Sequence, residues 1–102
     1  MSRPTVRIAH LLMERPDSPR HAYGIGKTLN MTGAEAKAVL ARMERKGLLT
    51  SEWMPGHGPA RKVYAVTGDG RAFFAKFLER ADQHPRYGPM LAAARQLRRT
   101  AV

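Results

Sequence analysis

The fold is decided by one stretch, Met31-Thr-Gly-Ala-Glu-Ala-Lys-Ala-Val-Leu-Ala-Arg-Met-Glu-Arg-Lys-Gly-Leu-Leu49. Thr32 and Glu35 have the spacing of a capping box, in which the threonine oxygen accepts a backbone N–H of the first turn and the glutamate reaches back to the cap N–H. Apolar residues then follow at the i, i+3, i+4, i+7 spacing of one helical face: Ala36, Val39, Leu40 and Met43. Gly47 stands where a helix end favours a left-handed residue. The stretch therefore predicts one capped, amphipathic helix.

The opposite face of this helix combines small residues with long cations. It carries Ala34, Lys37, Ala38, Ala41, Arg42 and Arg45. Small side chains let the helix backbone approach a surface closely, and cations at the borders suit a polyanion, so this face favours entry into a DNA major groove. The alternative is an ordinary surface helix of a basic protein, and the helix alone does not separate the two.

The charge of the whole chain points the same way. The 102 residues suffice for one domain, and 18 Lys plus Arg against 8 Asp plus Glu give a formal net charge of +10. Such an excess suits phosphate backbones, although an anionic membrane surface or an acidic protein would also attract it. The cations are spread along the chain, which favours a folded basic surface over a disordered basic arm.

Several classes of protein are excluded or disfavoured. The chain has no cysteine, so disulfides and Cys-rich zinc sites are excluded. No apolar run approaches the about 20 residues of a membrane helix, and no signal-peptide core follows the N-terminus. No two of the 4 histidines lie at i, i+4, and no carboxylate pair stands in an apolar setting. We therefore expect no enzyme activity, metal, cofactor or membrane partner, and a cytoplasmic location in a bacterium or a phage-infected bacterial cell.

Two helices are predicted upstream of the opening stretch. The first, Thr5 to Glu14, is apolar over most of its circumference and therefore needs two partners. The second partner could be another helix of this chain or a second subunit, and the sequence leaves both open. Ser18 can cap a second helix that runs from Pro19 to about Asn30. This helix and the one after Thr32 make a helix-turn-helix outline.

Two strand-like runs follow, Leu48–Met54 and Arg61–Thr67, around a loop of Gly and Pro at 55–59. They predict a β-hairpin with a protruding loop, and a hairpin directly after a helix-turn-helix is the order of a winged helix. Trp53 and Tyr64 are predicted to form the hairpin core. His57, Arg61 and Lys62 lie at or near the tip, where they could hold phosphates or simply keep an edge strand soluble.

The last third of the chain predicts two more helices, Asp69 to Gln83 and Pro89 to Arg99. A winged helix already has a core, so apolar residues here are surplus, and a surplus patch marks an association site. We favour a homodimer over a helical cap on a monomer. The predicted dimer contacts are Leu11, Phe73, Phe74, Phe77, Leu78, Met90 and Leu97. The chain divides accordingly into a DNA-binding domain, residues 1–68, and a dimerisation segment, residues 69–102.

Three runs together resemble the PadR-type winged-helix transcriptional regulators. Arg42-Met-Glu-Arg-Lys-Gly-Leu-Leu49, Ser51-Glu-Trp53 and Gly58-Pro-Ala-Arg-Lys-Val-Tyr-Ala-Val-Thr-Gly-Asp-Gly-Arg71 are similar to the family patterns RLExxGLL, SEW and GPPRKYYxLTxxGR. Tyr23-Gly-Ile-Gly-Lys-Thr-Leu29 is similar to its YEIIKxL segment. The resemblance spans about residues 8 to 80, and the hairpin portion is the most specific.

The resemblance implies a homodimeric DNA-binding repressor whose C-terminal helices make contacts between subunits, and some relatives bind a small molecule near that interface. This sequence departs from the family pattern at the front of the recognition helix, where TLYP is replaced by Glu35-Ala-Lys-Ala38 and the DNA-contacting tyrosine by Lys37. Its C-terminal part is short and interrupted by Pro85 and Pro89. No aromatic sandwich for an effector is visible, so an effector is possible without being supported.

We therefore predict an α+β, mainly α, winged helix-turn-helix protein that binds double-stranded DNA as a homodimeric regulator, with a repressor favoured. The predicted DNA contacts are Lys27, Lys37, Ala38, Ala41, Arg42, Arg45, His57, Arg61 and Lys62, with Arg20 and His21 as further candidates. Two alternatives stay open: an architectural or recombination-accessory DNA binder of a mobile element, and a protein-binding adaptor or inhibitor built on a winged helix.

Overall fold

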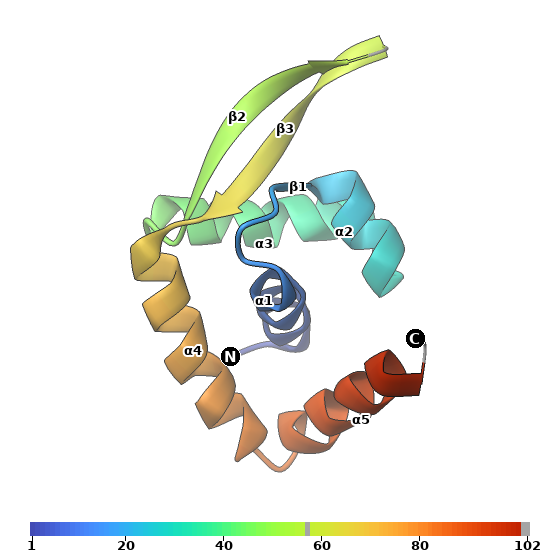
Figure 1. Ribbon diagram of the computed structural model, residues 1–102, viewed down its shortest axis with the longest axis vertical. Coiled ribbons are helices and arrows are strands. Elements are labelled where there is room, and N and C mark those ends of the chain that lie inside the picture. The colour runs from blue at the N-terminus through green and yellow to red at the C-terminus, as the bar shows by residue number, and fades with distance from the viewer. Residues whose placement is uncertain (57, 101–102) are drawn as a thin grey trace.

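The computed structural model describes residues 1–56 and 58–100, and within them it has five helices and one three-stranded antiparallel sheet (Figure 1). The α+β, mainly helical, winged helix-turn-helix fold predicted from the sequence is confirmed. His57, a predicted DNA contact, lies outside the described residues. The elements in order are α1 (Arg3–Glu14), β1 (Arg20–His21), α2 (Ala22–Leu29), α3 (Gly33–Arg45), β2 (Leu49–Gly56), β3 (Gly58–Val66), α4 (Gly68–Asp82) and α5 (Tyr87–Thr100).

Helix α1 is the centre of the protein, and α2, α3, α4 and α5 surround it (Figure 1). It begins two residues earlier than predicted because Ser2 caps it, with Ser2 Oγ accepting the N–H of Thr5 at 3.4 Å. Residues on both of its apolar sides are fully buried: Val6, Ile8, Ala9, Leu11 and Leu12. The second apolar side, for which the sequence left two partners open, is covered by α4 and α5 of the same chain.

The second helix begins later than predicted. Arg20 and His21, expected in the first helical turn, instead form the short strand β1 and pair with Tyr64 and Val63 of β3. His21 then caps α2, because its Nδ1 accepts the backbone N–H of Gly24 at 3.0 Å. The strand order is β1-β3-β2, so β3 is the central strand at the base of the hairpin.

The hairpin of β2 and β3, which we call the wing, projects from the body of the molecule (Figure 1). Its strands pair from Leu49↔Val66 to Gly56↔Gly58, with an irregularity in register between Met54 and Gly56, so they extend into the segment predicted as a loop. Tyr64 is buried as predicted, but the prediction for Trp53 was wrong: its side chain is 66% exposed. The reason is that the wing has left the body of the protein by the level of Trp53.

The C-terminal helices close the core on the other side of α1. Thr67 caps α4 as predicted, with its Oγ1 accepting the N–H of Gly70 at 2.9 Å and donating to the carbonyl of Gly47 at 2.8 Å. α4 begins one residue, and α5 two residues, before the predicted starts. The residues that these helices bury are Phe74, Phe77, Ala81, Tyr87 and Leu91. Three predicted dimer contacts, Leu11, Phe74 and Phe77, therefore lie in the core of this chain instead of on its surface.

Candidate nucleic-acid interface

Helix α3 presents the face that its sequence predicts. Ala36, Val39, Leu40 and Met43 are buried against the body. The outward side carries Ala34, Lys37, Ala38, Arg42 and Arg45, all exposed, with Ala41 half-buried. The capping box is half formed, because Thr32 Oγ1 accepts the N–H of Glu35 at 3.1 Å. The alanines therefore form a low, exposed ridge with cations at its borders. A ridge of this shape can enter the major groove of DNA.

The turn before α3 is tight and fixes the angle between the two helices. Asn30 adopts a left-handed conformation, with φ of 55°, and the N–H of Met31 donates to the carbonyl of Gly26 at 2.8 Å. A Cβ at Gly26 would lie 2.8 Å from the Met31 carbonyl oxygen, so a side chain there would push α2 and α3 apart. The guanidinium of Arg7 donates to the carbonyl of Leu29, which anchors the end of α2 on α1.

A carboxylate joins the wing to α3. Ser51 Oγ on β2 donates to Glu44 Oε2 on α3 at 2.5 Å, and Lys62 Nζ on β3 lies 3.5 Å from Glu44 Oε1. The hydrogen bond from Ser51, helped by the nearby charge of Lys62, holds the pKa of Glu44 below its ordinary value. Lys62, for which the sequence left a phosphate contact or simple solvation of an edge strand open, is therefore also a structural partner, and its charge is partly neutralised. We call these three residues the wing tether.

A concave pocket of about 430 Å³ opens between the wing, the start of α2 and α3. We call it the wing pocket. It brings together three predicted DNA contacts from two elements: Lys37 of α3 with Arg61 and Lys62 of β3. Two residues that the sequence reasoning did not assign to the site, Tyr23 and Trp53, also line it and are 63% and 66% exposed.

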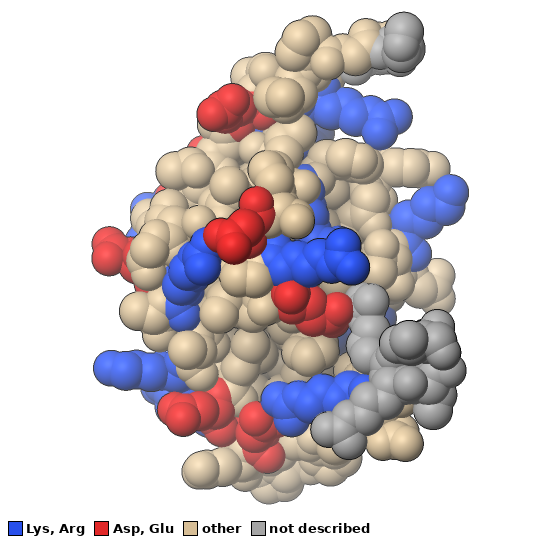
Figure 2. Space-filling model, in the orientation of Figure 1, with Lys and Arg blue, Asp and Glu red and all other residues tan. Residues whose placement is uncertain are grey.

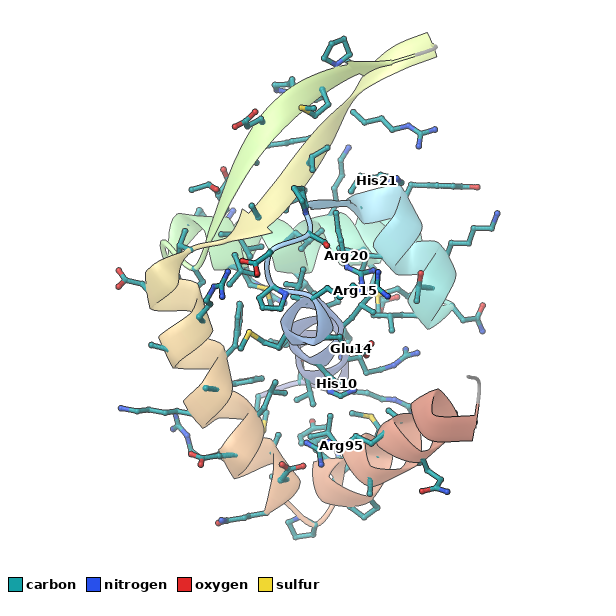
Figure 3. All side chains as sticks on the ribbon, in the orientation of Figure 1. His10, Glu14, Arg15, Arg20, His21 and Arg95 are labelled. Carbon is teal, nitrogen blue, oxygen red and sulfur yellow. The ribbon has the colours of Figure 1, made fainter. Side chains whose placement is uncertain are left out.

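Strand pairing could have identified Trp53 as part of this site. It lies directly opposite Lys62, and paired residues share one face of a hairpin. Arg61 Nη1 lies 3.5 Å from His21 Nε2, so His21, which Figure 3 places where β1 meets α2, supports the edge of the pocket. Lys27 belongs to α2 and is exposed, with its Nζ 6.0 Å from the centre of the Tyr23 ring.

Charge is not uniform over the surface. On the face shown in Figure 2, acidic and basic side chains alternate over the middle of the molecule, whereas basic side chains project at the edge below the wing. A single-sign edge of this kind attracts a polyanion and raises its rate of association.

Among residues 1–56 and 58–100, no three His, Asp or Glu side chains are grouped so as to hold a metal ion. His10 lies 3.4 Å from Glu14 on α1, where Figure 3 shows both, and His84 Nδ1 accepts the N–H of Arg86. None of the described helices is long and apolar enough to cross a membrane.

The helix-turn-helix, the wing beside it and the cationic ridge of α3 define a winged-helix protein of the DNA-binding type. The sequence model of the Transcriptional regulator PadR-like family matches residues 10–76, which is more than half of the chain. The protein therefore belongs to the PadR-like family of transcriptional regulators. No curated protein matches the chain.

Solved structures share the fold at low sequence identity. A PadR family transcription regulator from Clostridium difficile R20291 is 23% identical, with 91% of this chain and 97% of that chain covered and a TM-score of 0.63. A transcriptional regulator homologue from Pyrococcus horikoshii OT3 is 24% identical over 74% of this chain and 72% of that chain, with a TM-score of 0.62. MepR of S. aureus, solved in complex with DNA, is 19% identical over 100% of this chain and 82% of that chain, with a TM-score of 0.65.

Proposed function

We propose that this protein is a cytoplasmic, homodimeric transcriptional repressor that binds a specific sequence of double-stranded DNA. The observation that carries the proposal is the outward face of α3, where exposed alanines lie between exposed cations beside a projecting wing. The repressor role rests on the family resemblance, and the DNA-bound structure of MepR supports the same class of ligand for a similar fold.

In this proposal the ridge of α3 enters the major groove. Ala38 and Ala41 let the backbone approach the base edges, and an arginine there can fork onto guanine, which is worth about 1–3 kcal/mol of discrimination. Lys37, Arg42 and Arg45 read bases. Lys27 and Arg61 contact phosphates, which fix register and affinity without reading sequence.

The second copy meets the C-terminal helices. The predicted dimer contacts that remain accessible are Phe73, 40% exposed, and Leu97, 69% exposed, with Leu78 and Met90 half-buried. The other predicted contacts support the dimer surface indirectly, because their packing in the core holds α4 and α5 on α1: Leu11, Phe74 and Phe77. In this proposal residues 69–102 form the dimerisation segment, although they share one hydrophobic core with residues 1–68.

The experiment is selection from a random-sequence duplex library by the full chain at two salt concentrations. We expect enrichment of a palindrome with half-sites about one helical turn apart, as a dimer requires, and affinity that falls steeply with salt. Arg42→Ala with Arg45→Ala should reduce selectivity by about tenfold or more, since each good contact is worth about 1–3 kcal/mol.

A variant with the same loss of charge on α4, Lys76→Ala with Arg80→Ala, serves as the control and should keep the same preferred sequence. Tight binding without any preferred sequence would replace the repressor by an architectural DNA binder. Binding to no duplex at either salt concentration would overturn the proposal.

A further inference from the structure

The two aromatic side chains of the wing pocket are unusual in their exposure. Trp53 and Tyr23 are among the most exposed large apolar residues of the described chain, and they line the same pocket. Tryptophan, tyrosine and arginine are the residue types that contribute most to binding interfaces. Because both rings line the wing pocket, we infer that a ligand bound there excludes water from their surfaces.

The wing holds Trp53 in a defined place. Going out along the inner face of the wing, the pair Leu49↔Val66 belongs to the body, the pair Ser51↔Tyr64 carries the hydrogen bond to Glu44, and Trp53↔Lys62 comes next. Lys62 Nζ is fixed 5.7 Å from the centre of the buried Tyr64 ring. Trp53 therefore lies directly opposite Lys62 of the wing tether, one pair beyond Ser51, on a strand that the tether joins to α3.

The other wall of the pocket belongs to α2. Tyr23 stands in the first turn, and its ring stacks on His21 with centroids 6.5 Å apart and an interplanar angle of 16°. His21 is itself fixed as the helix cap. Both aromatic walls thus rest on residues that hydrogen bonds or strand pairing already hold, so little freedom is lost when a ligand packs against them.

We propose that one sugar-phosphate strand of the bound duplex passes through the wing pocket, with deoxyribose packed on Trp53 and Tyr23 and phosphate held by Arg61. This inference rests on the proposed function and adds an apolar contact to it. Two observations favour a DNA strand as the occupant. The cations of the pocket complement a polyanion, and Lys37 belongs both to the pocket and to the ridge of α3, so the two surfaces are continuous.

Salt dependence separates the apolar contact from the ionic ones. Loss of one phosphate-binding cation, as in Arg61→Ala, lowers the slope of log affinity against log salt by about 1. Loss of a ring that packs on sugar does not change the number of counterions released when the duplex binds. The slope therefore stays the same while affinity falls at every salt concentration. We expect Trp53→Ala to weaken duplex binding by about tenfold, which corresponds to about 1.4 kcal/mol, and Tyr23→Ala to act in the same direction.

Met54→Ala is the matched control, because Met54 is the next residue of the same strand, is 48% exposed and does not line the wing pocket. Its duplex affinity should equal that of the wild type, and Trp53→Phe should retain more affinity than Trp53→Ala. Trp53 is also the only tryptophan of the chain. Saturating random-sequence duplex should therefore change the emission of the wild-type protein, with no substitution needed.

The proposal is overturned if Trp53→Ala and Tyr23→Ala bind the duplex as tightly as the wild type and Trp53 emission does not respond to saturating duplex. If the substitution of Arg42 and Arg45 still removes selectivity in that case, the proposed function survives and only the path of the strand is wrong. If the wild-type protein binds no duplex, both the proposed function and the proposed path of the strand are wrong.

Discussion

The wing and the C-terminal helices both carry large aromatic residues, and they use them in opposite ways. Phe74 and Tyr87 are 1% and 5% exposed and pack around α1, whereas Trp53 is 66% exposed on the wing. The cause is the number of layers: α4 and α5 lie against the central helix, while the outer part of the wing has no second layer over it (Figure 1). The aromatic residues of the C-terminal helices therefore stabilise the core, whereas Trp53 of the wing forms part of the exposed surface.

An isolated two-stranded hairpin is marginally stable in water. Beyond the two residues that pair with β1, the wing is such a hairpin, and it is joined to the body by the wing tether and by the contact of Arg61 with His21. This contrast leads to three predictions on stability, in order of expected effect.

The largest effect is expected from Phe74→Ala. Phe74 is among the largest fully buried side chains, and truncating a buried phenylalanine costs about 3–5 kcal/mol. Urea unfolding followed by circular dichroism measures the loss. Phe73→Ala is the matched control on the same helix, because Phe73 is 40% exposed and should lose much less in dilute protein. Equal losses for the two variants would show that α4 does not close the core on α1 as described.

A smaller loss is expected at the joint between the two regions, from Gly70→Ala. A Cβ at Gly70 would lie 2.1 Å from the carbonyl oxygen of Leu48, which is backbone and already accepts the N–H of Thr67 at 3.1 Å. Overpacking of this kind costs about 1–3 kcal/mol. Gly68→Ala, two residues earlier in the same turn, meets nothing within 4 Å and should be neutral or slightly stabilising. Thermal unfolding of both variants decides the point, and a neutral Gly70→Ala would contradict the close approach of α4 to Leu48.

Local signals were enough to predict most of the fold. The caps at Thr32 and Thr67 need only one hydrogen bond within the next three residues, and both are present. Gly47 has a φ of 77°, as expected for a residue just after a helix. The exposed face of α3 also followed from helical spacing, because a 3.6-residue period fixes which side chains share a side.

What failed depended on contacts between distant parts of the chain. The alternation of β2 indicates that Trp53 shares a face with buried Leu49, but no local pattern says how far the body extends along that face. β1 exists because Arg20 and His21 pair with residues more than forty positions later. The apolar residues of α4 and α5 were predicted to be surplus to the core, but Phe74, Phe77 and Leu91 belong to it. Spacing does not distinguish the central helix of the same chain from a second copy.

The smallest effect is expected from Glu44→Gln, which removes the charge of the wing tether and keeps the shape of the side chain. The pKa of Glu44 is lower in the folded state than its ordinary value, because Ser51 donates to the carboxylate and Lys62 lies beside it. The tether therefore contributes stability above the ordinary glutamate pKa, and this contribution is lost as the pH falls through the folded-state pKa.

Hydrogen exchange of wing amides should be faster in Glu44→Gln than in the wild type near neutral pH. The difference should shrink as Glu44 is protonated in acid, whereas Glu79→Gln, the same change on the exposed side of α4, should leave wing exchange unchanged. If Glu44→Gln leaves it unchanged as well, strand pairing alone holds the wing, and the rigid placement of Trp53 has another cause.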